Sequence, residues 1–167
     1  MQTFLPFPDF TASAAALDPR RLGKQRVEAV QVLRGLIVPG YGWRRHPAVR
    51  MWAGYEEALV RYGLDICEAW TRDGRADTCA VTLVHDFMAW KPDATMRTQA
   101  ALGADGDLPD WLGNPEFHRS HRSALLRKDP GYYRTRFPDM AEDATDDVPY
   151  VWPKSDRDPE AGGPGLP

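Results

Sequence analysis

The stretch LDPRRLGKQRVEAVQVLRGL, residues 17–36, carries the strongest helical signal in the chain. Asp18 is a suitable N-cap, and the proline after it stands at the first helical position, where proline is favoured. At about 100° per residue, the apolar side chains share one side of the helix: Leu22, Ala29, Leu33 and Leu36. The stretch therefore predicts an amphipathic helix that runs to about residue 36 and packs this side into a core.

The opposite side of this helix carries basic residues around a single carboxylate, Glu28. Lys24 lies one turn and Arg21 two turns before Glu28 on the same polar stripe. Opposite charges within about 4–6 Å favour an ionised carboxylate, which can stabilise a cation or accept a proton. The alternative is an ordinary surface pair of Lys24 and Glu28. Arg26 projects toward the edge of the apolar side, where an arginine has either a partner or a stem that reaches back to water.

The net charge of −3 conceals a strong partition along the chain. Residues 20–50 carry eight Lys and Arg against Glu28 alone, and residues 115–136 carry six against two acids. Residues 137–160 carry eight acids against two basic residues. Local fields steer a polyanion more than total charge does, so nucleic acid remains a credible partner. A cationic surface with one ionised carboxylate suits chemistry on a sugar–phosphate backbone, where cations hold phosphates and the carboxylate stabilises charge at the anomeric carbon.

The stretch GYGWRRHPAVRMW, residues 40–52, interleaves aromatic and basic side chains. Aromatic faces for stacking and guanidinium groups for phosphate are the features that bind single strands or flipped bases. The alternative is that Trp43 and Trp52 pack in the core while Arg44 and Arg45 are solvated.

The stretch FHRSHRSALLRK, residues 117–128, puts His118, His121 and Arg122 on one helix face. Such a group can contact phosphate or transfer protons at a nucleic-acid site. Metal binding by the two histidines is a further alternative, but no third ligand stands in an obvious place. Purely structural roles also remain open.

The remaining pattern predicts an all-α, compact single-domain helical fold with long loops and an acidic, Pro/Gly-rich C-terminal tail. Further helices are expected at residues 47–70, 77–90 and 115–128, with one helical turn at 96–102 inside a loop at 91–113. The expected organisation is a helical domain at 1–137, an acidic and aromatic extension at 138–153 that docks on it, and a disordered tail at 154–167.

Several classes of protein do not fit the composition. No run approaches the roughly 18 apolar residues of a membrane span, and the first ten residues lack the pattern of a secretory signal. Cys67 and Cys79 lack metal-type spacing and are expected to be reduced. We therefore expect a cytoplasmic monomer without a membrane partner, and we expect no cofactor and no metal.

Four motifs in this order resemble the pyrimidine-dimer DNA glycosylases of the endonuclease V type, bacterial and phage proteins: LDPRRLGKQRVEAVQ, HPAVRMWAGYEEAL with RDG, HRSHRSALLRKDPGYY, and VPYVWP. The resemblance extends from about residue 1 to residue 153 and implies a small all-α domain. It also implies excision of a damaged pyrimidine and then β-elimination (AP lyase activity), with the chain's own α-amino group as nucleophile. A helical glutamate assists, and Glu28 stands in its place, six residues after Leu22.

The sequence departs from the family pattern at two positions. The second residue, Gln2, is too large for routine removal of the first methionine, so either Met1 supplies the amine or Glu28 activates water. Val27 stands where the family has an arginine next to its glutamate, and Arg26 lies one residue earlier. The interpretation thus predicts a DNA repair glycosylase with Glu28 and Met1 as catalytic residues. The expected DNA-binding residues are Arg20, Arg21, Lys24, Arg26, Arg44, Arg45, His46, His118, His121, Arg122, Tyr132 and Tyr133.

Two other classes of function fit the same residues. One is a non-catalytic nucleic-acid binding module of the same fold, in which loss of Glu28 leaves function intact. The other is a nucleoside- or nucleotide-processing enzyme, which would show no salt-dependent affinity for DNA.

Overall fold

A computed structural model describes residues 1–140 and 148–159 of the chain. The helix predicted from residues 17–36 lies at the centre of the molecule. Within these described ranges the chain is helical and forms no strand. The α-helices are α1 Phe10–Ala16, α2 Pro19–Ile37, α3 Pro47–Arg50, α4 Glu56–Thr71, α5 Cys79–Trp90, α6 Gln99–Ala104, α7 Pro115–Lys128 and α8 Pro130–Tyr133, followed by a 3₁₀ helix, Pro138–Met140. The fold is all-α and compact, as the sequence predicts. No helix in the described part of the chain is both long enough and apolar enough to span a bilayer.

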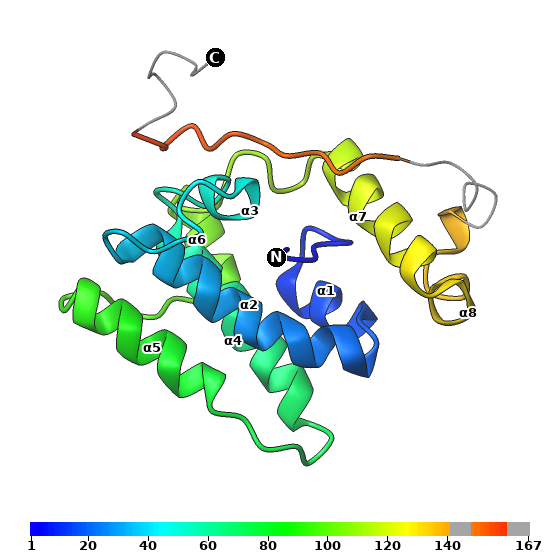
Figure 1. Cartoon of the computed structure of the whole chain (residues 1–167), viewed down its shortest axis with the longest axis horizontal. Helices are drawn as coiled ribbons and strands as arrows, with labels where there is room; N and C mark the ends of the chain where they lie inside the picture. Colours follow the sequence, from blue (N-terminus) through cyan, green and yellow to red (C-terminus); the bar gives the residue numbers. More distant parts are fainter. Residues whose placement is uncertain (141–147, 160–167) are drawn as a thin grey trace.

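Helix α2 packs against α4 and α5, and α7 lies across the N-terminal segment from it (Figure 1). Asp18 caps α2 by accepting hydrogen bonds from the first backbone N–H groups, and Ala29 and Leu33 are fully buried in the core. At Gly63 on α4, a Cβ would lie 2.6 Å from Leu83 Cδ1 of α5 and 3.0 Å from Ala29 Cβ of α2, so the three helices approach one another closely at this glycine.

Helices α2, α5 and α7 agree with the predicted ranges, but the single helix expected at 47–70 is wrong. Two helices, α3 and α4, occupy that range, and a turn separates them. Gly54 in this turn has φ +80°, a conformation that residues with a Cβ rarely adopt. The chain therefore changes direction there. Helices α1 and α8 were not predicted from the pattern, since each is under two turns long and depends on an aspartate cap, Asp9 or Asp129.

Residues 148–159, which we call the C-terminal strap, run from α7 to the turn between α3 and α4 (Figure 1). Near its start, Val151 N donates to Ser120 Oγ of α7 at 3.2 Å. Near its end, the buried Ser155 donates its hydroxyl to the carbonyl of Ala53. Residues 154–159 are thus held against the helices, which corrects the predicted disordered tail from residue 154. Residues 141–147 and 160–167, which belong to the predicted extension and tail, lie outside the described residues.

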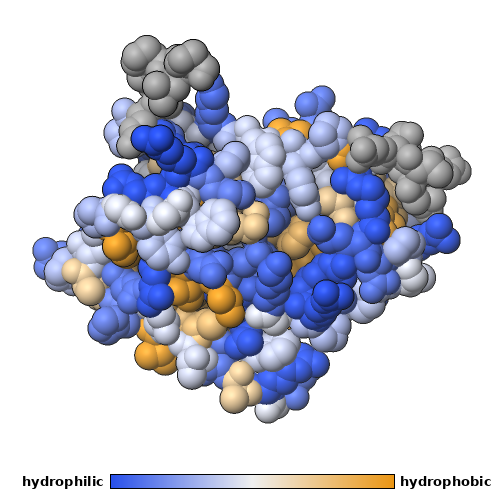
Figure 2. Space-filling model, viewed as in Figure 1, coloured by the Kyte–Doolittle hydropathy of each residue, from blue (hydrophilic) through white to orange (hydrophobic). Residues whose placement is uncertain are grey.

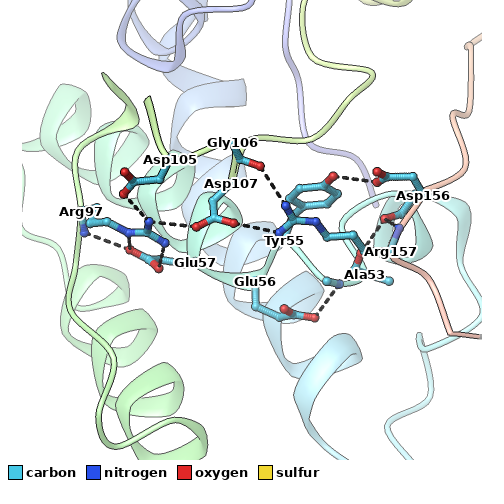
Figure 3. A network of polar contacts seen from close by, with 12 residues as sticks. Ala53, Tyr55, Glu56, Glu57, Arg97, Asp105, Gly106, Asp107, Asp156 and Arg157 are labelled. Carbon is cyan, nitrogen blue, oxygen red and sulfur yellow. Dashed lines mark hydrogen bonds and ion pairs between the residues drawn. The ribbon is translucent and has the colours of Figure 1, made fainter. Parts of the chain in front are cut away.

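An ionic network fixes the far end of the strap (Figure 3). Arg157 donates to Asp107 at 3.0 Å and to the carbonyl of Gly106 at 2.8 Å, and its guanidinium lies 4.4 Å from the centre of the Tyr55 ring. Tyr55 donates its hydroxyl to Asp156 at 2.6 Å. Burial and this bond raise the pKa of Tyr55 to about 12, so the phenol stays a donor. The strap is therefore attached at several points to the helical domain.

Candidate active site

A cavity of about 420 Å³ lies where the N-terminal segment meets α2. Its walls come from the N-terminal segment, α2, the loop before α3, the end of α7 and the C-terminal strap. Figure 1 shows the N-terminus between α2, α7 and the strap, and Figure 2 shows hydrophilic residues around a recessed apolar area in this central region. The strap thus closes one side of a cavity whose other side is the polar face of α2.

Glu28 forms part of the inner wall, although its side chain is only 8 % exposed. Its Oε1 lies 3.9 Å from the Met1 α-amino nitrogen and 3.5 Å from Lys24 Nζ. Its Oε2 accepts a 2.6 Å hydrogen bond from Gln25 Nε2. One carboxylate oxygen therefore faces two amines, while the other is held by a neutral amide.

Gln25 connects this carboxylate to the N-terminal segment, and the sequence interpretation missed it. Its Nε2 also donates to the carbonyl of Gln2 at 2.8 Å, and its Oε1 accepts from Phe4 N at 2.8 Å and from Tyr62 Oη at 2.7 Å. Burial raises the pKa of Tyr62 well above its usual range, so Tyr62 remains a donor. The available signal was the position of Gln25, three residues before Glu28 on the same helix face.

His118 and His121 of α7 hold the N-terminal segment from the other side. His118 Nδ1 donates to the carbonyl of Leu5 at 2.8 Å, since Nε2 of this ring accepts from Gly113 N. Leu5 N in turn donates to His121 Nδ1 at 3.1 Å. We call these two residues the histidine clamp, because they bind both backbone groups of Leu5.

The histidine clamp is buried, which corrects the prediction that His118 and His121 contact DNA. His118 is 3 % exposed and His121 is fully buried, so neither reaches a phosphate at the surface. Burial lowers the pKa of His118 and lowers that of His121 to about 3, so both rings are neutral at pH 7. Their role in the described structure is to fix the backbone that leads to Met1.

Comparison with known proteins identifies the family of the chain. Residues 1–83 match the model of the family described as pyrimidine dimer DNA glycosylase. The chain belongs to this family. No curated protein and no solved structure matches it.

Members of the pyrimidine dimer DNA glycosylase family are DNA repair enzymes, so membership implies DNA as the substrate. The matched half contains Met1, Glu28 and all of α2, and it ends before α7 and the C-terminal strap. The family match and the cavity therefore coincide at the polar face of α2.

The structure brings six of the predicted site residues together around the cavity: Met1, Arg20, Arg21, Lys24, Glu28 and His46. Arg21 also donates to Asp18 Oδ2 at 2.7 Å, and Asp18 in turn accepts the hydroxyl of Tyr133. The α2 side of the cavity is therefore cationic at its rim.

Arg26 lies away from the cavity, contrary to its prediction as a DNA-binding residue near Glu28. Its guanidinium pairs with Asp77, at the start of the α5 segment, and lies 4.2 Å from the centre of the Trp70 ring. Asp77 is nearly buried and its pKa is lowered, with burial acting against the bonds from Ala80 N and Arg26. Arg26 therefore has a protein partner and links α2 to α4 and α5.

The loop before α3 divides the two tryptophans of the 40–52 stretch. Trp52 is fully buried and donates to Thr3 Oγ1 at 3.0 Å, whereas Trp43 is 49 % exposed. Arg44 and Arg45 are exposed next to Trp43 and do not line the cavity. Their contact with DNA stays a prediction.

Three other predicted DNA-binding residues make contacts that support the fold. Tyr133 is fully buried, and Tyr132 donates to the carbonyl of Leu17 at 3.2 Å. Arg122 donates to the carbonyl of Pro6 at 2.8 Å, and its side chain is 16 % exposed. Burial keeps Tyr133 from the surface, whereas contact of the partly exposed Tyr132 and Arg122 with DNA stays a prediction.

The strap contributes two aromatic wall residues that the sequence interpretation did not place in the site. Tyr150 packs with its ring centre 5.5 Å from that of His121, and Trp152 packs edge-on to His46 at 5.9 Å. Lys128, at the end of α7, adds a further cation to the cavity wall. Only the path of the strap brings Tyr150 and Trp152 to α2.

In the described ranges no group of three His, Cys, Asp or Glu side chains is arranged to hold a metal ion.

Proposed function

We propose that this DNA repair glycosylase also has AP lyase activity, with the Met1 α-amine as nucleophile and Glu28 as the carboxylate that assists it. The observation that carries the proposal is the distance of 3.9 Å between the Met1 nitrogen and Glu28 Oε1 inside a cavity. An amine next to a carboxylate in a recessed, cation-rimmed site suits attack on a deoxyribose carbon.

The reaction follows from the two groups. The amine lone pair forms a bond to C1′, and the electron pair of the C1′–N1 bond leaves with the base. Opening of the sugar ring then gives a protonated imine, as the amine nitrogen loses one proton and O4′ gains one. Glu28 is near enough to the amine to accept that proton and to stabilise the positive charge that develops at C1′.

Elimination completes the lyase step. Loss of a proton from C2′ breaks the bond to the 3′ phosphate oxygen, and water then hydrolyses the imine and frees Met1. The cations at the rim, Arg20, Lys24 and Lys128, are suited to hold the phosphates on either side of the reacting sugar. α-Amines are less basic than lysine side chains, which favours an α-amine as the nucleophile at cellular pH.

Borohydride trapping tests the proposal, because borohydride reduces an imine to a stable covalent bond. We expect the intact protein to give a covalent band with DNA that carries an abasic site or a cyclobutane dimer, and none with undamaged DNA. Peptide mapping is expected to locate the bond at Met1, and the intact mass is expected to include Met1. Glu28→Gln should lower the rate of trapping by roughly 10²-fold or more.

The matched control is Glu116→Gln, which removes an exposed carboxylate on α7 and should leave trapping unchanged. Base excision without trapping would overturn the imine step and favour water activated by Glu28. A wild-type protein that neither traps nor cleaves any of these strands would overturn the proposed activity as a whole.

A further inference from the structure

His46 has one ring nitrogen committed to the protein and the other without a described partner. It is the N-cap of α3, where its Nδ1 accepts a 3.1 Å hydrogen bond from Ala48 N. A neutral imidazole whose Nδ1 accepts must carry its proton on Nε2. Among the contacts of the described residues, Nε2 makes no hydrogen bond, while the ring lines the cavity.

The surroundings of His46 differ from the cationic α2 side of the cavity. Its ring packs edge-on to Trp43 at 5.7 Å and to Trp152 at 5.9 Å. Burial, and secondarily the charge of the N-terminal ammonium group, lower the pKa of His46, whereas Glu28 opposes this shift. At neutral pH the ring is therefore an uncharged donor beside aromatic faces.

The two sides of the cavity suit different parts of a nucleotide. Cations at the α2 rim suit phosphate, whereas an uncharged N–H beside aromatic rings suits the carbonyl oxygen of a base. A pyrimidine carries such a carbonyl next to the nitrogen that bears the sugar, and negative charge collects there as the base departs. Donors aimed at developing charge accelerate such a step.

We propose that His46 is a further catalytic residue, whose Nε2–H donates a hydrogen bond to the carbonyl oxygen of the departing pyrimidine beside the glycosidic bond. This inference rests on the proposed function. The electron pair of the C1′–N1 bond moves onto the base, the His46 proton remains on Nε2, and the base anion takes its proton from solvent. The hydrogen bond from Ala48 N to Nδ1 positions the ring, because it fixes the tautomer in which Nε2 carries the proton.

Two substitutions separate the two nitrogens of the ring. Asparagine can supply an oxygen near the position of Nδ1, so His46→Asn keeps the cap on α3 but removes the donor to the cavity. Glutamine places its amide nitrogen near the position of Nε2, so His46→Gln keeps a donor but loses the cap. A purely structural role for His46 predicts that the glutamine variant is the more damaged in activity, and our proposal predicts the opposite.

The experiment compares wild type and both variants on two duplexes, one with a cyclobutane pyrimidine dimer and one with an abasic site. We expect His46→Asn to excise the dimer roughly 10²-fold more slowly and to cleave the abasic site at the wild-type rate, because that site has no base to contact. His46→Gln should melt at a lower temperature but excise the dimer within about tenfold of wild type.

The possible failures are distinguishable. If wild type cleaves neither duplex and forms no borohydride adduct, the proposed function fails. If wild type is active and His46→Asn excises the dimer as fast as wild type does, the His46 inference alone is wrong. An equal loss on both duplexes for His46→Asn would also overturn it, since it would indicate a role in placing the amine.

Discussion

Helices α2 and α7 carry similar sequence patterns, with basic or titratable side chains at steps of three and four residues, yet they have different roles. The polar face of α2 opens to the cavity and presents Glu28 and Lys24 there. The corresponding face of α7 is buried, and its histidines bind the backbone of Leu5. The same spacing therefore places charged side chains at the cavity on one helix and supports the N-terminal segment on the other. The difference lies in what packs against each face.

Among the changes that test this comparison of α2 with α7, the largest effect is expected from breaking the support on α7. His118→Ala removes the hydrogen bonds to Leu5 and Gly113 and leaves the buried carbonyl of Leu5 without this partner. We expect the free energy of unfolding to fall by about 1–3 kcal/mol. Dimer excision, measured where the variant is fully folded, should fall roughly tenfold or more, because the Met1 amine is no longer held near Glu28.

Urea unfolding and single-turnover excision measure these two effects of His118→Ala. Glu116→Gln on the same helix is the control for both. Unchanged excision in a folded but destabilised His118→Ala protein would show that the clamp serves stability alone.

A smaller effect separates two cations of α2 that were both predicted to bind DNA. Lys24 is 72 % exposed at the cavity, whereas Arg26 pairs with Asp77 on another face. Lys24→Ala should reduce the slope of log K for DNA binding against log salt by about 0.9, the value for one phosphate contact on duplex DNA. Arg26→Gln, which keeps a donor for Asp77, should leave the slope unchanged. Titrations at several salt concentrations measure it, and equal slopes for both variants would contradict the division of α2 into two faces.

The smallest effect concerns the dependence of stability on pH. The lowered pKa of buried His121, about 3, means that the native state binds fewer protons than the unfolded state below the ordinary histidine pKa. Stability therefore falls as pH drops through about 6.5, by less than about 1 kcal/mol for this residue between pH 7 and pH 6. Burial is the main cause of the low pKa of His121, and the neighbouring His118 lowers it further. Burial lowers the pKa of His118 as well.

Urea midpoints at pH 7 and pH 6 test this prediction with His121→Asn, which keeps an acceptor for Leu5 N but does not titrate. The variant should show a weaker loss of stability than wild type, with the remaining slope due in part to His118. An identical slope in both proteins would show that the burial of His121 does not control this dependence.

The sequence by itself determined the helices with strong local signals. Proline at the first position and a side-chain cap mark the start of both α2 and α7, and these signals are local, so they can be read without knowledge of the fold. The isolation of Glu28 among basic residues was equally visible, and the first two of the four family motifs lie within the match over residues 1–83.

Only the tertiary structure decided which side chains share the cavity. Periodicity assigns a residue to a helix face but does not say what covers that face, so His121 and Arg26 were expected at the DNA surface. The break between α3 and α4 depends on Gly54, where a Cβ would lie 2.4 Å from Arg157 Cβ of the strap. Contacts between residues so distant along the chain are set by the packing of whole elements. The positions of Met1, His46 and Trp152 around Glu28 are therefore properties of the folded molecule.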